Sequence, residues 1–182
     1  NVDPKHVDIY VKVDEGKKYY IRNIKWVGNT VYSTDYLSRL LDMKKGDVYN
    51  QTYLNKRLSQ DEDAVGNAYW NNGYLFYNLQ PTEVNIVGDS IDLEMRITEG
   101  QQARINRVRI NGNDRLYENV VRRELRTKPG DLFSKEALQR SARELASMGH
   151  FDPEAINPVP EPNYEDGTVD INYNLKQKSN DQ

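Results

Sequence analysis

The chain repeats itself at an offset of 84 positions, and this repeat limits the possible folds more than any other feature. Residues 27–33 (Val-Gly-Asn-Thr-Val-Tyr-Ser) return as residues 111–117 (Asn-Gly-Asn-Asp-Arg-Leu-Tyr), each time after an apolar run. Further pairs at this offset are Leu41 and Leu125, Gly46 and Gly130, Asp47 and Asp131, and Leu54 and Leu138. A repeat of about 80 residues in a chain of 182 predicts two small tandem domains, each with a modest core.

Each repeat predicts the element order strand, helix, helix, strand, strand. Alternating apolar and polar residues are typical of strands with one buried face, whereas apolar residues three or four apart are typical of helices. Ser33 and Ser134 are suited to cap helices, because a serine hydroxyl accepts a free amide hydrogen of the first turn. In the first repeat we expect strands at 21–27, 74–87 and 91–98, a tight turn at Gly88-Asp89, and helices from Ser33 to Lys45-Gly46 and from 50 to 72.

The pattern of the last strand occurs three times, at residues 7–14, 91–98 and 169–176. The chain therefore contains two complete repeats and the end of a third. We expect residues 1–16 to be the last strand of a preceding domain, so that at least one more domain lies upstream in the natural protein. The sequence begins without an initiator methionine or a signal peptide, which indicates an excised fragment.

Prolines fall in the strand that precedes the last one in each repeat. Pro81 lies inside this strand in the first repeat, and Pro158, Pro160 and Pro162 lie in the corresponding stretch of the second. Proline has no amide hydrogen to donate to a neighbouring strand, so it is confined to sheet edges. Both strands are therefore predicted to be edge strands.

Composition and charge argue against several functional classes. The net charge is −3, which gives no support for nucleic-acid binding, and no apolar run approaches the length of a membrane-spanning helix. The chain has no cysteine, and it lacks the usual nucleophile, phosphate-binding and metalloprotease motifs, so we expect no enzymatic activity, cofactor or metal. Residues 101–143 carry eleven Lys and Arg against five Asp and Glu, whereas residues 144–182 carry two against eight, a polarity that suits a charged partner.

The repeated order, with Gly-Asn after the first strand, Gly-Asp between the helices and a glycine at the end of the second helix, resembles the POTRA domain. The resemblance covers nearly the whole chain. It implies an α+β fold of tandem POTRA domains, each β-α-α-β-β, with a three-stranded mixed sheet and two helices on one face.

The second copy resembles the last POTRA domain before the membrane barrel in BamA-type outer-membrane protein assembly factors. Residues 122–125 (Arg-Arg-Glu-Leu), 129–133 (Pro-Gly-Asp-Leu-Phe), 148–151 (Met-Gly-His-Phe) and 166–170 (Asp-Gly-Thr-Val-Asp) carry this resemblance. Because the family usually has five such domains, the resemblance implies that residues 17–100 are the fourth and 101–178 the fifth. Residues 179–182 would then be a linker toward the barrel.

The resemblance implies the periplasmic part of an outer-membrane protein in a Gram-negative bacterium, which is soluble as a fragment. Its partners would be unfolded outer-membrane proteins, accessory assembly lipoproteins and its own C-terminal barrel. An exposed strand edge can bind an extended client through main-chain hydrogen bonds. The residues that we expect to bind clients in this way are Leu75, Phe76, Tyr77, Asn78 and Leu79.

The resemblance also implies a basic docking surface on the second domain. The short linker at residues 98–102 predicts a hinge of limited swing between the domains. Arginine suits docking because its planar guanidinium pairs with carboxylates through two hydrogen bonds. The expected docking residues are Arg109, Arg122, Arg123, Glu124 and Arg126, and the expected hinge residues are Gly100 and Gln101. The simpler interpretations remain that the edge residues pair within their own sheet and that the arginines form a solvated helix face.

Two other functional classes remain open from the residues alone. One is a POTRA pair of a two-partner secretion or translocation-assembly transporter. The other is a hydrolase or small-ligand domain that uses the acidic stretch 164–166.

Overall fold

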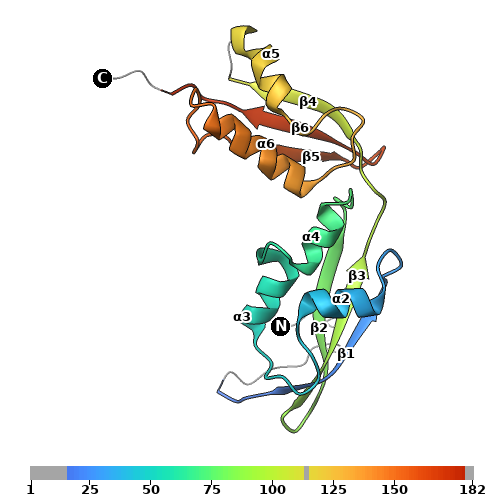
Figure 1. Ribbon diagram of the computed structural model, residues 1–182. Helices are drawn as coiled ribbons and strands as arrows, with labels where there is room; N and C mark the ends of the chain where they lie inside the picture. The colour runs from blue at the N-terminus through green and yellow to red at the C-terminus, as the bar shows by residue number, and fades with distance from the viewer. Residues whose placement is uncertain (1–15, 113–114, 179–182) are drawn as a thin grey trace, which may run out of the picture. The chain divides into compact units, whose positions relative to one another are not determined.

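The computed structural model describes residues 16–112 and 115–178. They form two compact units. One unit holds the described residues through Ala68 together with Tyr77–Glu99, and the other holds Tyr69–Phe76 together with the described residues from Gly100 onward. Each unit consists of a three-stranded sheet with helices on one face, which is the predicted tandem α+β architecture (Figure 1). The strand expected at residues 7–14 lies outside the described residues.

The sheet of the first unit has the strand order β1-β3-β2. The central strand β3 pairs in parallel with β1 and antiparallel with β2, so the sheet is mixed as predicted. The proline-containing strand β2 is therefore an edge strand, which confirms the prediction from Pro81. The strands are β1 (Tyr20–Val27), β2 (Asn78–Val87) and β3 (Ser90–Thr98), and β3 directs Ile91, Leu93, Met95 and Ile97 into the core.

The first helix of this unit, α2 (Thr34–Leu41), begins as the sequence predicted. The Ser33 hydroxyl accepts a hydrogen bond from the Tyr36 amide at 3.1 Å, and Leu37 and Leu41 are fully buried. The predicted end at Lys45-Gly46 was wrong. The helix ends at Leu41 because Asp42 adopts a left-handed conformation (φ 54°) while its amide returns to the Ser38 carbonyl.

The second helical region of the first unit is interrupted, and the predicted continuous helix from 50 to 72 was wrong. Three short pieces replace it, namely α3 (Gln51–Asn55), the π-helical turn η1 (Lys56–Gln60) and α4 (Val65–Trp70). The cause is Arg57, whose side chain is buried and donates to the Leu40 carbonyl at 2.5 Å and to Asp63 Oδ1 at 2.6 Å. The chain turns after η1, and Asp63 reaches this guanidinium. Residues 61–63 therefore lie in a turn and not inside the predicted helix.

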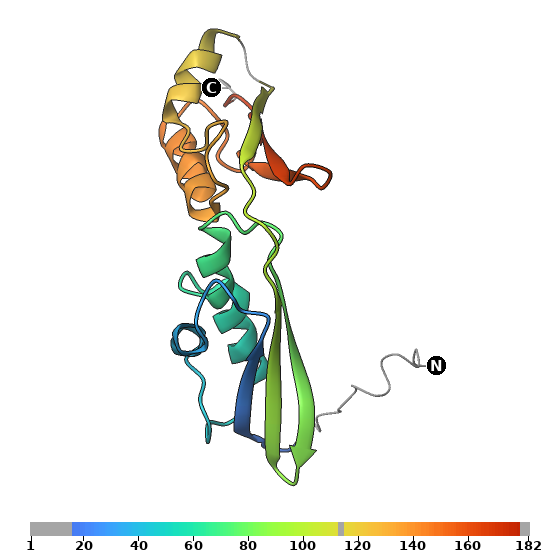
Figure 2. The ribbon, with the colours of Figure 1, turned by 90° about the vertical axis from the view of Figure 1, so that its right-hand side faces the viewer.

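The second unit repeats the topology, with strand order β4-β6-β5. Its helices lie on one face of the sheet, as Figure 2 shows from another side. Strand β6 pairs in parallel with β4 and antiparallel with β5, so β5 is the predicted edge strand. Its second helix is continuous and is capped by the Ser134 hydroxyl, which accepts from the Ala137 amide at 3.1 Å. The elements are β4 (Ile105–Asn111), α5 (Arg115–Glu124), α6 (Lys135–Ser147), β5 (Val159–Asn163) and β6 (Thr168–Asn174).

The repeated Gly-Asn motif has a common structural reason. Gly28 adopts φ +92°, and a Cβ atom there would lie 2.0 Å from the Ile97 carbonyl oxygen. Gly112 adopts φ +77°, and its Cβ would lie 2.3 Å from the Leu175 carbonyl oxygen. In both units the first strand ends so close to the backbone of the last strand that only glycine fits.

The helices of the described residues are all too short and too polar to cross a bilayer.

Candidate binding edges of the sheets

The outer edge of β2 carries unpaired backbone groups. A two-residue turn at Gly88-Asp89 joins β2 to β3, so Val87 and Ser90 form the first hydrogen-bonded pair of the ladder, and bonded pairs alternate from there. By this alternation Leu79, Pro81 and Glu83 direct their backbone amide and carbonyl groups away from β3. Ile86 faces outward as well, but a register shift between Glu83 and Asn85 separates it from this stretch. Since proline has no amide hydrogen, residues 79–83 present two amide donors and three carbonyl acceptors to an added strand.

The Glu83 side chain is fixed beside this edge by the region between the helices. Its Oε1 accepts hydrogen bonds from the Tyr49 hydroxyl and from Gln51 Nε2, each at 3.0 Å. Burial, followed by the negative charge of Glu83, raises the pKa of Tyr49 above its usual range. Tyr49 therefore remains a hydrogen-bond donor. Both contacts are made to the Glu83 side chain, so the outward backbone groups of Glu83 stay unpaired.

The outer edge of β5 is much poorer in donors. The Val169 amide donates to the Arg104 carbonyl, so Val169 and Ile171 direct their backbone groups toward β4. Their partners on the other side, Pro162 and Pro160, consequently face away from the sheet. Both outward positions are prolines, and an added strand would meet only carbonyl acceptors there.

The first strand of each sheet is covered in part by the turn between the two helices. In the first unit the Gly46 amide donates to the Ile21 carbonyl at 2.7 Å, and the Ile21 amide donates to the Asp47 carbonyl at 2.8 Å. The repeated Gly-Asp motif thus occupies the outward groups of Ile21. We call residues 46–47 and 130–131 the Gly-Asp turns.

The second unit repeats this arrangement atom for atom. The Gly130 amide donates to the Ile105 carbonyl, and the Ile105 amide donates to the Asp131 carbonyl, both at 2.8 Å. The beginning of the first strand is therefore closed to other strands in both units.

The predicted client-binding residues do not all lie on the β2 edge. The strand begins at Asn78, so the expectation that it begins at residue 74 was wrong. The Tyr74 amide donates to the Tyr69 carbonyl at 3.0 Å, and the Leu75 amide donates to the Gly73 carbonyl at 2.9 Å, so both amides close the turn after α4. Of the predicted residues, Leu75 and Phe76 are half-buried in this turn against the second core, Tyr77 is 8% exposed, and Asn78 and Leu79 open the strand.

The predicted docking arginines are spread over the second unit, and three of them have carboxylate partners. Arg109 on β4 lies 3.3 Å from Asp170. Arg122 on α5 lies 3.0 Å from Glu118, and Arg126 after α5 lies 2.8 Å from Glu144. The remaining predicted residues, Arg123 and Glu124, end helix α5; Arg123 is exposed and makes no ion pair with residues 16–112 or 115–178.

Arg122 has a second contact that the sequence did not suggest. Its Nη1 and Nη2 both donate to the Val108 carbonyl at 3.3 Å. This carbonyl is one of the outward groups of β4, so Arg122 covers the edge of its own sheet just past the Gly-Asp turn. An exposed arginine on a helix gives no sequence signal for a contact with a carbonyl 14 residues earlier.

The predicted hinge residues Gly100 and Gln101 lie between β3 and β4, outside regular secondary structure. Gly100 adopts φ +69°, and both residues are exposed. Their role as a hinge stays a prediction.

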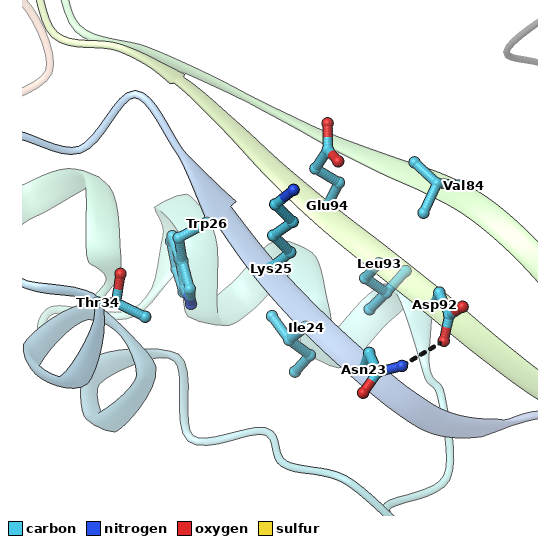
Figure 3. Close-up of a pocket in the computed structure, with 9 residues that line it drawn as sticks. All are labelled: Asn23, Ile24, Lys25, Trp26, Thr34, Val84, Asp92, Leu93 and Glu94. Carbon is cyan, nitrogen blue, oxygen red and sulfur yellow. Dashed lines mark hydrogen bonds between the residues drawn. The ribbon is translucent and has the colours of Figure 1, made fainter.

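A hollow of about 590 Å³ is lined by residues from all three strands of the first sheet and by Thr34 of α2 (Figure 3). It begins beyond the part of β1 that the Gly-Asp turn covers. On one side Asn23, Lys25, Asp92 and Glu94 line it, and Ile24, Trp26, Leu93, Val84 and Thr34 complete the lining. Neither this hollow nor the outward groups of Glu83 were predicted, because the hollow depends on how the strands and α2 pack and the outward groups depend on the register of the folded sheet.

Comparison with known proteins places this geometry in a family. Residues 19–100 and 103–178 each match the POTRA family, described as surface antigen variable number repeat. The chain is 29% identical over 181 residues to the outer membrane protein assembly factor BamA of Neisseria meningitidis serogroup B, covering 98% of this chain and 22% of that protein. It is 28% identical over 174 residues to a putative outer membrane protein assembly factor of Treponema pallidum, covering 95% of this chain and 20% of that protein.

Solved structures support the fold. The crystal structure of Haemophilus influenzae BamA POTRA3-5 matches with a TM-score of 0.72 at 18% identity, over 87% of this chain and 61% of that one. BamA from Haemophilus ducreyi lacking POTRA domains 1-3 matches with a TM-score of 0.69 at 23% identity, over 88% of this chain and 30% of that one. The chain spans about a fifth of the length of these two sequence relatives. It belongs to the POTRA family, as two tandem domains of the kind found in BamA-type outer membrane protein assembly factors.

Proposed function

We propose that the two domains are part of the periplasmic region of an outer-membrane β-barrel assembly factor and bind unfolded outer-membrane proteins by β-augmentation. The names of the sequence relatives support the first part of this proposal. The observation that carries the second part is the outer edge of β2, where Leu79, Pro81 and Glu83 offer backbone groups that the sheet leaves unpaired.

Strand addition at this edge is nearly independent of the client's sequence. An extended segment lying beside residues 79–83 of β2 meets two amide donors and three carbonyl acceptors, whatever its side chains are. Each main-chain hydrogen bond contributes only about 0.5 to 1.5 kcal/mol net. Binding is therefore weak and reversible, as the transfer of many different clients to a barrel requires.

The proposal includes docking of accessory assembly lipoproteins to the second domain. Among the residues expected for this role, Arg123 is the one whose guanidinium is exposed and has no carboxylate partner in the described part of the chain. Arg109, Arg122 and Arg126 would have to exchange Asp170, Glu118 and Glu144 for a partner's carboxylates. The assignment to the fourth and fifth domains, the barrel that would follow and the hinge at Gly100 and Gln101 belong to the same proposal.

A proline at Leu79 tests the edge. Leu79 directs its amide outward, so Leu79→Pro removes a donor for the client and leaves the ladder to β3 intact. We expect a labelled ten-residue barrel-strand peptide to bind about two- to tenfold more weakly, as the loss of one hydrogen bond predicts.

Leu79→Ala is the matched control, because it shortens the same side chain but keeps the amide. It should bind the peptide nearly as the unmodified chain does. If Leu79→Pro keeps its thermal midpoint and its peptide affinity, strand addition at β2 is not the binding mode.

A further inference from the structure

The central strand of the second sheet, β6, presents polar side chains to the face that the helices leave free. Its residues Ile171 and Tyr173 are fully buried in the core on the helix side. Because successive residues of a strand point to opposite faces, the alternate residues lie on the open face, away from α5 and α6 (Figure 2). These open-face residues are Asp170, Asn172 and Asn174.

Asn172 is the one of these three whose side-chain oxygen is left without a partner. Asp170 Oδ1 accepts from Asn106 Nδ2 at 3.2 Å, and Asn174 Oδ1 accepts from Asn111 Nδ2 at 3.2 Å. Asn172 is 8% exposed although it lies on the open face. Its Oδ1 is buried and accepts no hydrogen bond from residues 16–112 or 115–178. A buried acceptor without a hydrogen bond is unfavourable, and a partner that supplies the donor relieves this cost.

The first unit has no unpaired atom at the corresponding position. The register places Glu94 beside Lys25 in the first sheet. It places Asn172 beside Arg109, the residue 84 positions after Lys25, in the second. Glu94 Oε1 accepts from Arg96 Nε at 2.7 Å, so this position is satisfied within the first sheet. The unpaired oxygen is therefore specific to the second repeat, and the fold does not require it.

The surroundings of Asn172 indicate which chemical group can reach it. Arg107 lies on the same face, level with Asp170, and it is exposed and makes no ion pair with residues 16–112 or 115–178. Arg109 lies level with Asn172, but its Nη1 is 3.3 Å from Asp170. On the other side of β6, Val159 lies level with Asn172 and is 36% exposed. A buried acceptor thus lies beside a guanidinium that is available to an added carboxylate.

We infer that the open face of the second sheet at Arg107 and Asn172 is a docking site for an acidic protein segment in which an Asp or Glu and an Asn or Gln are two residues apart. The carboxylate pairs with the Arg107 guanidinium, which can donate two hydrogen bonds to it. The side-chain amide donates to Asn172 Oδ1. Arg107 and the level of Asn172 are two residues apart along the sheet, about 7 Å, which is the spacing of side chains on one side of an extended segment.

Other donors fit this position less well. A lysine ammonium would lie beside the Arg109 guanidinium, and like charges repel. A serine hydroxyl is carried on one carbon and reaches a buried atom less easily than an amide on a longer side chain. The contacts are made by side chains on a sheet face, so they do not involve the backbone groups of a sheet edge. The inference rests on the proposed function only in taking the partner to be a protein.

An NMR titration of the isotope-labelled 182-residue chain tests the site. The probe is the ten-residue peptide Gly-Ser-Thr-Ser-Glu-Thr-Gln-Ser-Thr-Gly. One control peptide carries Gln in place of Glu, and the other carries Leu in place of Gln. We expect the side-chain resonances of Arg107 and Asn172 to shift, and each control peptide to bind about fivefold more weakly or less, because each lacks one hydrogen-bonding group.

Variants of the chain test the two residues separately. Arg107→Gln and Asn172→Leu should each weaken binding of the probe by about fivefold or more. Arg123→Gln and Asn174→Ala are the matched controls, since Arg123 is an exposed arginine on α5 and the Asn174 oxygen is already bonded to Asn111. Both controls should keep the affinity. The urea midpoint of Asn172→Leu should not fall, because the change removes a buried acceptor that has no partner.

Three results would overturn the inference. Weaker binding in Arg123→Gln with none in Arg107→Gln or Asn172→Leu places the partner on α5 and leaves the proposed function standing. Failure of the probe to bind the unmodified chain overturns the inference alone, because strand addition at β2 is measured with a different peptide. A lower urea midpoint of Asn172→Leu with unchanged affinity shows that solvent satisfies Asn172 and that its role is structural.

Discussion

Arg22 donates from Nε to Oδ1 of Asp92 at 2.8 Å and joins the irregularity in β1 to the central strand. The register of β1 against β3 shifts between Ile21 and Asn23, so Arg22 is the extra residue of a bulge. Asn23 Nδ2 reaches the same carboxylate at 3.3 Å. In the second unit the register shifts at the corresponding place, and Asn106 donates to Asp170. An aspartate opposite the bulge is thus common to both sheets.

The Arg22–Asp92 pair predicts a loss of stability in acid. The hydrogen bonds from Arg22, more than its charge alone, lower the pKa of Asp92. A carboxyl whose pKa is lower in the folded state stabilises the fold above its unfolded pKa of about 3.9 and ceases to do so as the pH falls through its folded pKa. Asp92→Asn should therefore be less stable than the unmodified chain at pH 7, and the difference should shrink below about pH 4. Urea unfolding of both proteins at pH 7 and below about pH 4 measures this difference. A difference in the free energy of unfolding that does not change with pH would contradict the prediction.

The two kinds of repeated glycine should differ in their tolerance of alanine. At Gly28 (φ +92°) a Cβ meets the Ile97 carbonyl oxygen, whereas at Gly46 (φ +95°) it has no neighbour within 4 Å among the described residues. Gly46→Ala should cost only the backbone strain of about 1 to 2 kcal/mol. Gly28→Ala should cost clearly more, because β1 and β3 must also move apart. Chemical denaturation of both variants shows which loses more stability. Equal losses would show that the close approach of Gly28 to the Ile97 carbonyl is unimportant.

Arg57 should contribute more to stability than an exposed arginine does. It is 8% exposed, and its guanidinium joins the Leu40 carbonyl to Asp63. We expect Arg57→Met to lower the free energy of unfolding by about 1.5 to 3 kcal/mol, the usual range for hydrogen bonds of a charged group. Arg140→Met is the control, since Arg140 pairs with Glu136 on the surface of α6 and should change stability by less than about 1 kcal/mol. Thermal or urea unfolding distinguishes the two variants. Similar losses of stability would mean that the hydrogen bonds of Arg57 contribute no more than a surface ion pair.

Pro81 should limit both client affinity and self-association. It sits between the outward amides of Leu79 and Glu83 and interrupts the row of donors. Pro81→Val supplies the missing donor on a residue that favours strands, so peptide affinity should rise by about two- to tenfold. The longer continuous edge should also promote association of the chain with itself. Fluorescence anisotropy measures the peptide affinity, and sedimentation velocity measures the self-association. An unchanged peptide affinity would show that clients do not use this part of β2.

Sequence reasoning predicted the sheets better than the helices. The alternation in β3 and the prolines in β2 and β5 are local signals, and they correctly indicated a strand with one buried face and the two edge strands. The mixed sheets followed from the POTRA resemblance. The break between η1 and α4 depends on Arg57 reaching a carbonyl 17 residues away, which no local pattern reports. The start of β2 was misplaced because residues 74–77 (Tyr-Leu-Phe-Tyr) are of types that favour strands, although the amides of Tyr74 and Leu75 are used by the turn after α4.

The candidate site was predictable only in outline. That an edge strand would be open followed from Pro81, and the structure gives β2 as that edge. Which amides face outward required the ladder register set by the turn at Gly88-Asp89. Arg122 was singled out for its charge, but its contact with Val108 depends on how α5 packs beside β4.

The position of the Gly-Asp turns also determines where the two repeats are free to diverge. Each turn lies before the second helical region, so the longer and interrupted region of the first copy, 19 residues from Leu54 to Gly73 against 11 from Leu138 to Gly149, leaves the bonds to Ile21 and Ile105 unchanged. Insertions after the turn can therefore reshape the helical layer of one domain without exposing the start of its first strand. An insertion of one residue inside the turn would uncouple both hydrogen bonds at once.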